Sequence, residues 1–248
     1  MLDDTFTLTS YENIVDPTTN DDGEKIQFKY EELPPHVQER VLNNEDRDPS
    51  YDWWDDTYEH ATEVAEYLGI SIDARNVRGS PIGVSHTQPD INFSGFCSQG
   101  DGACFNGQLN IAMMEDGLAK LEANGINDVE LIAFATRAKD VYNEILAEET
   151  ARRIIGNEDD HNLYWIDTSS TLTIRGQQRG CFTTAITDED DYENAELASD
   201  LLDEFVSDFA DYIYSQLEKE YDYLTSDAYV IEGFTENNVL FDESGVKL

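Results

Sequence analysis

The chain has 248 residues and is strongly acidic: 54 Asp and Glu face 15 Lys and Arg, which gives a formal net charge of −39 at pH 7. A surface of this sign repels nucleic acid and anionic membranes, so direct binding to either is excluded as an expected function. Hydrophobic residues make up 40% and aromatic residues 11% of the chain, which supplies enough apolar material for a folded core and argues against general disorder.

Apolar periodicity and turn signals predict helices interspersed with strands. In chain order, these are a strand over residues 25–32, helices over 36–44 and 51–68, strands over 70–77, 91–96 and 103–111, helices over 112–125 and 128–156, strands over 161–178 and 179–188, a helix over 190–224, a short helix over 227–231 and a strand over 238–243. Because the expected strand pairs are hairpins, the pattern predicts an α+β fold with a mostly antiparallel sheet covered by amphipathic helices.

Three positions mark the ends of these helices, and two ranges mark the domain organisation. Pro35 fits the first turn of one helix, Ser50 is a candidate N-cap of the next, and Gly69 is expected to end it. Residues 1–24 are predicted to be an acidic N-terminal extension, which ends in the turn signal NDDG. Residues 25–248 are predicted to form a single α+β domain.

The long helix predicted near the C-terminus has one apolar and one acidic face. Leu197, Leu201, Phe205 and further apolar residues recur every four positions, and eleven carboxylates lie between Asp188 and Asp211 with no Lys or Arg among them. Either this face is solvated, with the first acids stabilised by the helix dipole, or it binds a basic partner. The candidate partner-binding residues are Asp188, Asp190, Asp191, Glu193, Glu196, Asp200, Asp203, Glu204, Asp208 and Asp211.

The segment FSGFCSQGDGAC, residues 93–104, is the strongest candidate for a ligand loop. It lacks both the order of a dinucleotide fingerprint and the Lys of a phosphate-binding loop, and Asp101 would repel a phosphate. Asp101-Gly102 between two apolar runs is typical of a tight hairpin turn that needs a positive φ. The hairpin and ligand-loop interpretations both remain, and the ligand-loop residues are Ser98, Gln99, Gly100, Asp101 and Gly102.

The other chemistry-bearing residues form no recognisable site. The three cysteines and four histidines show neither a CxxC pair nor zinc-ligand spacing, and no catalytic motif with a nucleophile and a base occurs, so no metal, cofactor or catalytic residue is predicted. The odd cysteine count fits a reduced cytoplasm. The N-terminus lacks the pattern of a signal peptide, and no apolar run has the length of a membrane span, so a cytoplasmic protein is expected.

Several segments together resemble a family of bacteriophage and prophage proteins that are sometimes labelled antitoxins of toxin–antitoxin systems. The resemblance covers the chain from about Tyr30 and is carried by YEELPPHVQERVLNN, YDWWDDTYEHATEVAEYLGI, the FSGFxSQGDGA motif at Phe93–Ala103, and LEKEYDYLTSDAYVIE. Members of that family often have Trp where this chain has Cys97. The resemblance implies a non-catalytic, inhibitory role in the cytoplasm of a host cell.

Charge and resemblance favour an inhibitor, antitoxin-like or directed against a host defence, that binds a basic face of a host nucleic-acid-binding protein, with DNA mimicry as one route. One alternative is a protein or enzyme that binds a small ligand or a divalent cation through the Ser98–Gly102 loop. Another is a structural or virion-associated phage protein. The acidity itself also has two simpler explanations, adaptation to salt and solubility.

Overall fold

The computed structural model describes residues 26–49, 52–77, 86–155, 166–177, 181–186 and 196–248. Contacts within the chain divide it into two compact units, one of residues 51–220 and one that joins residues 1–50 to residues 221–248. This division leaves the single domain over 25–248 as a prediction, and the extension at 1–24 lies outside the described residues.

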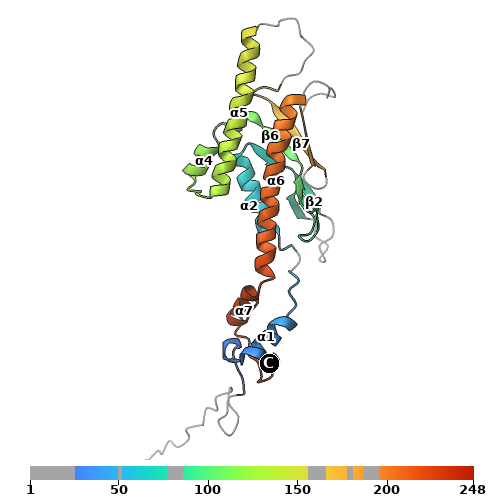
Figure 1. Ribbon diagram of the computed structural model, residues 1–248, viewed down its shortest axis with the longest axis vertical. Coiled ribbons are helices and arrows are strands. Elements are labelled where there is room, and N and C mark those ends of the chain that lie inside the picture. The colour runs from blue at the N-terminus through green and yellow to red at the C-terminus, as the bar shows by residue number, and fades with distance from the viewer. Residues whose placement is uncertain (1–25, 50–51, 78–85, 156–165, 178–180, 187–195) are drawn as a thin grey trace, which may run out of the picture. The chain divides into compact units, whose positions relative to one another are not determined.

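The larger unit, Tyr51–Glu220, combines helices with short antiparallel strands (Figure 1). Its elements are α2 (Asp55–Tyr67), β1 (Ile70–Ile72), β2 (Ala74–Val77), β3 (His86–Pro89), β4 (Ile91–Phe93), β5 (Ala103–Phe105), β6 (Gly107–Asn110), α3 (Ile111–Met114), α4 (Gly117–Ala123), α5 (Val129–Ile155), β7 (Thr171–Gln177), β8 (Cys181–Ile186) and most of α6 (Glu196–Leu224). The predicted α+β class, with antiparallel strands and a long C-terminal helix, is confirmed.

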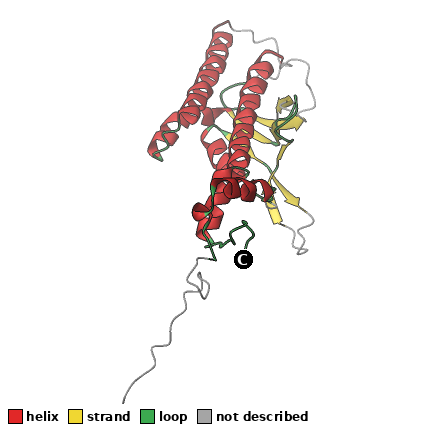
Figure 2. Cartoon of the chain, turned by 60° about the horizontal axis from the view of Figure 1, so that its bottom comes forward, coloured by secondary structure: helices red, strands yellow, loops and turns green. Residues whose placement is uncertain are grey.

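The strands form one four-stranded antiparallel sheet in the order β1-β6-β7-β8 and two two-stranded sheets, β2-β3 and β4-β5. The register pairs Ile70 with Leu109, Leu109 with Leu172, and Leu172 with Ile186 across the main sheet. Figure 2 shows the strands on one side of this unit and the long helices on the other. Leu109, Leu172 and Ile174 are fully buried together with Phe205, Phe209 and Ile213 of α6, so the predicted amphipathic helix covers the sheet.

Several predicted elements of this unit have different bounds. The predicted strand 70–77 divides at Asp73, whose N–H donates to the Asn106 carbonyl (2.8 Å), so that β1 and β2 belong to different sheets. The predicted strand 103–111 likewise divides into β5 and β6, and the predicted helix 112–125 is two helices, α3 and α4. The strand β3 was not predicted.

The start of α2 also differs from the prediction. Asp52 has a positive φ of 65°, and residues 52–54 form a turn, so the helix begins at Asp55 with Trp54 at the N-cap and the prediction of Ser50 as N-cap is wrong. Gly69 ends this helix as predicted. Its φ is 81°, and a Cβ there would lie 2.6 Å from the Asn110 carbonyl oxygen, so both the backbone angle and the packing require glycine.

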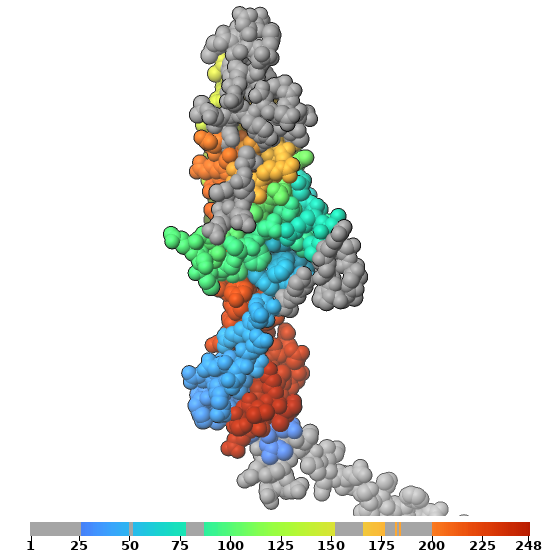
Figure 3. Space-filling view, turned by 90° about the vertical axis from the view of Figure 1, so that its right-hand side faces the viewer, coloured from blue at the N-terminus to red at the C-terminus, as the bar shows by residue number. Residues whose placement is uncertain are grey.

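The smaller unit contains η1 (Tyr30–Glu32), α1 (Pro35–Asn44) and α7 (Asp227–Glu236). Figure 3 shows its N-terminal and C-terminal parts, coloured blue and red, packed against each other. Tyr30, Leu33, Val37, Val41, Phe234 and Phe241 form its separate buried core. Helix α1 has Pro35 at its first position as predicted, and α7 extends five residues beyond the predicted end at Ile231.

The two terminal strands predicted in this unit are wrong. The described residues 26–32 contribute only the isolated bridge between Phe28 and Phe241, followed by the short helix η1, before which the Lys29 N–H donates to the Glu32 carboxylate (2.8 Å). Residues 238–243 likewise form only bridges, from Phe241 to Phe28 and to Lys247. In both segments, alternating apolar and polar side chains produced the strand signal. In the first segment, the hydrogen bond between Lys29 and Glu32 caps a short helix, and the alternation of side chains does not reveal such a cap.

Candidate functional site

The segment 93–104 forms a hairpin, as predicted, but its turn differs from the predicted one. Strands β4 and β5 pair in antiparallel register from Ile91–Phe105 to Phe93–Ala103, which leaves a loop of residues 94–102 rather than a two-residue Asp-Gly turn. The positive φ of 102° falls at Gly100. The prediction of a tight turn at Asp101-Gly102 is therefore wrong, while the hairpin itself is confirmed.

The Asp101 carboxylate organises this loop from inside. One of its oxygens accepts hydrogen bonds from the Cys97 N–H (3.0 Å) and the Ser98 N–H (2.7 Å), and the Ser94 hydroxyl accepts one from the Gly102 N–H (3.2 Å). The backbone amides of Cys97, Ser98 and Gly102 are thus already bonded within the loop. Ser98, Gln99 and Gly100 are exposed, and ligand binding by Ser98–Gly102 stays a prediction.

An aromatic cluster attaches the same hairpin to α2 and α6. Phe93 lies 5.7 Å, centroid to centroid, from both Trp53 and Trp54, and Phe96 lies 5.3 Å from Tyr214. The Tyr214 hydroxyl also donates to the Gly95 carbonyl (2.8 Å). Aromatic pairs of this kind stabilise a fold beyond their buried area. The FSGF part of the motif therefore has a structural role, as an anchor for the loop.

Replacing Asp101 by Ala is expected to loosen the loop at a cost of about 1 kcal/mol, because two backbone N–H groups lose their acceptor. Hydrogen exchange of the amides of 94–102 should accelerate while exchange in β7 stays unchanged. Ser98→Ala is the matched control, since the structure shows no hydrogen bond of the Ser98 side chain, and it should leave exchange as in the wild type. Equal protection in both variants would disprove the internal role of Asp101.

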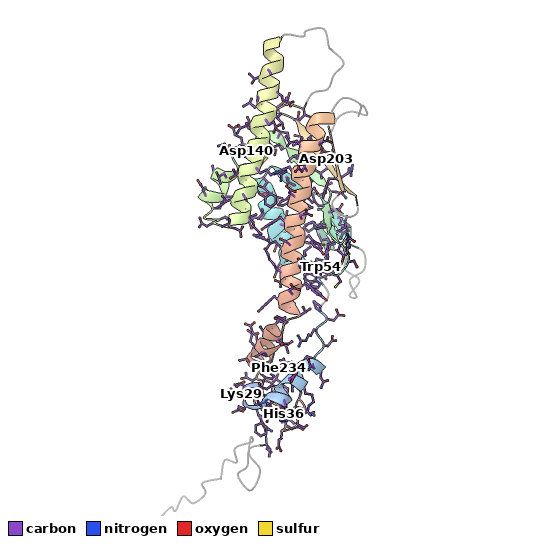
Figure 4. All side chains as sticks on the ribbon, viewed as in Figure 1. Lys29, His36, Trp54, Asp140, Asp203 and Phe234 are labelled. Carbon is purple, nitrogen blue, oxygen red and sulfur yellow. The ribbon has the colours of Figure 1, made fainter. Side chains whose placement is uncertain are left out.

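The structure divides the predicted acidic face into members with different roles. Asp188, Asp190, Asp191 and Glu193 lie outside the described residues, and Glu196 begins α6. Asp203 accepts a hydrogen bond from the Thr184 N–H (2.8 Å) and so ties α6 to β8 (Figure 4). Asp200 and Asp211 are exposed. The predicted face is thus partly structural.

Glu204 and Asp208 both form ion pairs with Arg137 of α5, at 3.2 Å for Glu204. This segment of α6 contains no Lys or Arg of its own, and Arg137 of α5 supplies the positive charge. The sequence of α6 alone does not reveal this pairing. These two exposed or half-exposed pairs contribute little stability, but they reduce the negative charge that this part of α6 presents.

A second acidic row, which was not predicted as a site, lies on α2. Its thirteen residues carry five exposed carboxylates and no Lys or Arg, namely Asp55, Asp56, Glu59, Glu63 and Glu66. Burial and the Glu63 carboxylate raise the pKa of Tyr67 on the same helix, as expected next to negative charge. The spacing of three and four residues was visible in the sequence, but spacing alone does not show which acids face solvent.

The rows on α2 and α6 belong to neighbouring helices. The Tyr212 hydroxyl of α6 lies 3.3 Å from Nε2 of His60 on α2. Up to Glu220, α6 carries eight acidic residues and a single base, Lys219, whereas α5 is almost balanced with five acids and four bases. Of these three helices, α2 and α6 therefore carry nearly all of the net negative charge.

An open groove runs between α5 and α6, with a volume of about 440 Å³. It is lined by Glu130, Ala133, Phe134, Arg137, Asp208, Asp211, Tyr212 and Ser215. The rings of Phe134 and Tyr212 meet edge to face at 5.6 Å. Burial raises the pKa of Asp211, and it raises the pKa of Tyr212 to about 12, with smaller contributions from Asp128 and Glu130. The groove combines aromatic rings with three carboxylates, of which Asp211 is partly desolvated.

The described residues offer little to a metal ion. Nowhere among them do three His, Cys, Asp or Glu side chains gather in a way that would hold one. Cys104 is buried and Cys97 exposed, and burial, followed by the charge of Asp90, raises the pKa of the Cys104 thiol, which disfavours the nucleophilic thiolate. Within the same residues, no helix has both the length and the apolar character to cross a membrane.

Fold and surface thus define an α+β protein with two adjacent, strongly acidic helices. The chain belongs to the family described as a domain of unknown function (DUF8835), which matches residues 53–227. This range begins two residues before α2 and ends at the first residue of α7, so it includes both acidic helices and the 93–104 hairpin. No curated protein and no solved structure matches the chain.

Proposed function

We propose that this protein is a non-catalytic inhibitor that binds a basic, nucleic-acid-binding face of another protein, in the manner of an antitoxin or an anti-defence protein of phage origin. The observation that carries the proposal is the row of five exposed carboxylates on α2, with no base on that helix, beside the acidic helix α6. Like charges on neighbouring helices repel one another, and a basic partner relieves that repulsion.

The two acidic helices differ in how their carboxylates interact with other elements of the chain. Asp203 is engaged by β8, and Glu204 and Asp208 are engaged by Arg137, so three carboxylates of α6 are already paired within the chain. On α2, Glu63 accepts only a weak hydrogen bond from the exposed Tyr67 hydroxyl (3.3 Å). The proposed binding surface is therefore centred on α2 and extended by Asp200 and Asp211, rather than following α6 alone.

Such a surface works through long-range attraction and through exclusion of nucleic acid from the same basic face. Carboxylates four residues apart on a helix repeat about every 6 Å along its axis. DNA mimicry in this sense requires only a negative row that the partner's Lys and Arg accept in place of phosphates. It requires no reacting group, in keeping with a non-catalytic role.

Neutralising α2 tests the proposal. The variant Glu59→Gln/Glu63→Gln/Glu66→Gln is expected to recover nucleic-acid-binding proteins from bacterial lysate several-fold less well than the wild type, because rim charges contribute attraction at low salt. Recovery by the wild type should fall steeply between about 0.01 M and 1 M salt, as the Debye length shrinks from about 30 to about 3 Å. The readout is quantitative mass spectrometry of the captured proteins.

The matched control removes the same number of charges elsewhere, as Glu122→Gln/Asp140→Asn/Glu144→Gln on the α4–α5 side (Figure 4 shows Asp140). This variant should retain wild-type recovery. If both triple variants lose recovery equally, net charge rather than α2 is responsible. If the wild type captures no nucleic-acid-binding protein at low salt, the proposed function is wrong.

A further inference from the structure

We propose that the groove between α5 and α6 binds an arginine side chain of the basic partner, with the guanidinium held by the Asp211 carboxylate and stacked on the Phe134 ring. This inference rests on the proposed function and names one contact through which the partner would be held. The groove should therefore prefer a guanidinium, with its flat and delocalised charge, over the ammonium group of lysine.

Charge in the groove favours a cation. Its lining carries three carboxylates, from Glu130, Asp208 and Asp211, and one guanidinium, from Arg137. Asp208 is paired with Arg137, and Glu130 accepts from Lys219 Nζ (3.3 Å) and from Gln216 Nε2 (3.3 Å). Among the described residues, Asp211 has neither an ion pair nor a hydrogen bond from its side chain. Asp211 is thus the carboxylate that an incoming cation can pair with.

The aromatic lining favours arginine over lysine. Phe134 is half-buried, so part of its ring is open to the groove. Tyr212 is 5% exposed and its hydroxyl contacts His60, which leaves its ring as its contribution to the groove. A guanidinium stacks on aromatic faces and pairs with a carboxylate through two N–H groups, whereas an ammonium is a compact and strongly hydrated charge. The apolar stem of arginine suits the surface beside Ala133.

The chain itself already uses this arrangement at the other end of the groove. Arg137 extends from α5 and places its guanidinium between Glu204 and Asp208 of α6. The side chains of α6 therefore accept one guanidinium between the two helices. Asp211 follows Asp208 by three residues, which places both carboxylates on the same side of α6. A partner arginine would repeat the internal pair about one turn further along.

The test compares two synthetic peptides that differ only in Arg against Lys at each basic position, titrated into the full chain and followed by fluorescence anisotropy. The arginine peptide is expected to bind roughly five- to ten-fold more tightly. Asp211→Asn and Phe134→Leu should each remove most of this preference, because each removes one of the two contacts. The α2 triple variant should weaken both peptides equally and keep the preference.

The same variants separate binding from folding. Because burial raises the pKa of Asp211 above its ordinary 3.8, its charge is less favourable in the folded than in the unfolded chain. Asp211→Asn should therefore melt at an equal or higher temperature at pH 7, and this difference should vanish as the pH falls through the raised pKa to well below 3.8, where the carboxyl is protonated in both states. Lower binding with undiminished stability assigns Asp211 to binding.

Equal affinity for the two peptides, or an Asp211→Asn variant that keeps the full arginine preference, would overturn the arginine site. The proposed function would then still be judged by the lysate capture and its α2 control. Conversely, a retained arginine preference with no captured nucleic-acid-binding protein would overturn the proposed function and leave a groove specific for arginine.

Discussion

Phe209→Ala is expected to destabilise the larger unit by about 3–5 kcal/mol, the cost of truncating a fully buried aromatic side chain. Phe209 is 0% exposed and its ring contacts three others: Phe105 at 5.9 Å, Phe134 at 6.1 Å and Tyr212 at 5.9 Å. These rings belong to β5, α5 and α6, so one side chain connects the β4-β5 sheet to both helices that line the groove. Since domains are stable by only about 5–15 kcal/mol, the loss is severe.

Urea denaturation followed by circular dichroism measures this effect as a lower midpoint. Phe209→Leu is the matched control, because it keeps an apolar side chain of related size and should cost less than about 1.5 kcal/mol. The Ala variant should also lose the arginine preference, since Phe134 and Tyr212 both rest on the Phe209 ring. A midpoint for Phe209→Ala close to that of the wild type would show that α6 does not pack on the β4-β5 sheet through this residue.

The elements that could be predicted from the sequence are those whose stability is local. The stripe from Phe205 to Leu217 has the spacing of a helix with one buried face, and α6 buries that stripe. Gly69 was found because a positive φ is a local requirement of a helix end. Such signals depend on neighbouring residues alone.

The elements that were missed depend on partners distant in sequence. Nothing near Asp73 shows that its N–H will bond to Asn106, or that the Asn106 N–H will bond to the Asp90 carbonyl (3.1 Å), yet these bonds divide two predicted strands between different sheets. The Asn106 side chain completes this junction, because its Nδ2 donates to Asp90 (2.7 Å) and its Oδ1 accepts from the Gly176 N–H (3.1 Å). The alternation of apolar and polar residues continued through this junction, so the sequence pattern did not show where the strands divide.

The candidate site shows the same limit. Its acidic character was predictable from composition, but its location was not, because Arg137 neutralises part of α6 from a helix more than sixty residues earlier in the chain. The groove between α5 and α6 was equally invisible, since Phe134 and Asp211 come together only through tertiary packing. Charge counts therefore support the proposal of a basic partner, and only the fold shows which carboxylates are exposed.

Gly107→Ala is expected to cost roughly 3 kcal/mol, because a Cβ at this position would lie 2.2 Å from the Ser71 carbonyl oxygen and 3.1 Å from the Ile72 Cα. Both atoms belong to the backbone of β1, which pairs Ile72 with Gly107, so no side-chain rotation can make room. Strand β1 has to move away from β6, and α2, which precedes it, has to follow. The acidic row on α2 should then lose its place beside α6.

Gly233→Ala makes the same chemical change where a Cβ meets nothing within 4 Å, in the middle of α7. There the added methyl group favours the helix, and the variant should be neutral or stabilised by about 0.5–1 kcal/mol. The expected result is a lower urea midpoint for Gly107→Ala and an equal or higher midpoint for Gly233→Ala, each relative to the wild type. A Gly107→Ala variant as stable as the wild type would contradict the close approach of β1 to β6, and with it the position of α2 on which the proposed binding surface depends.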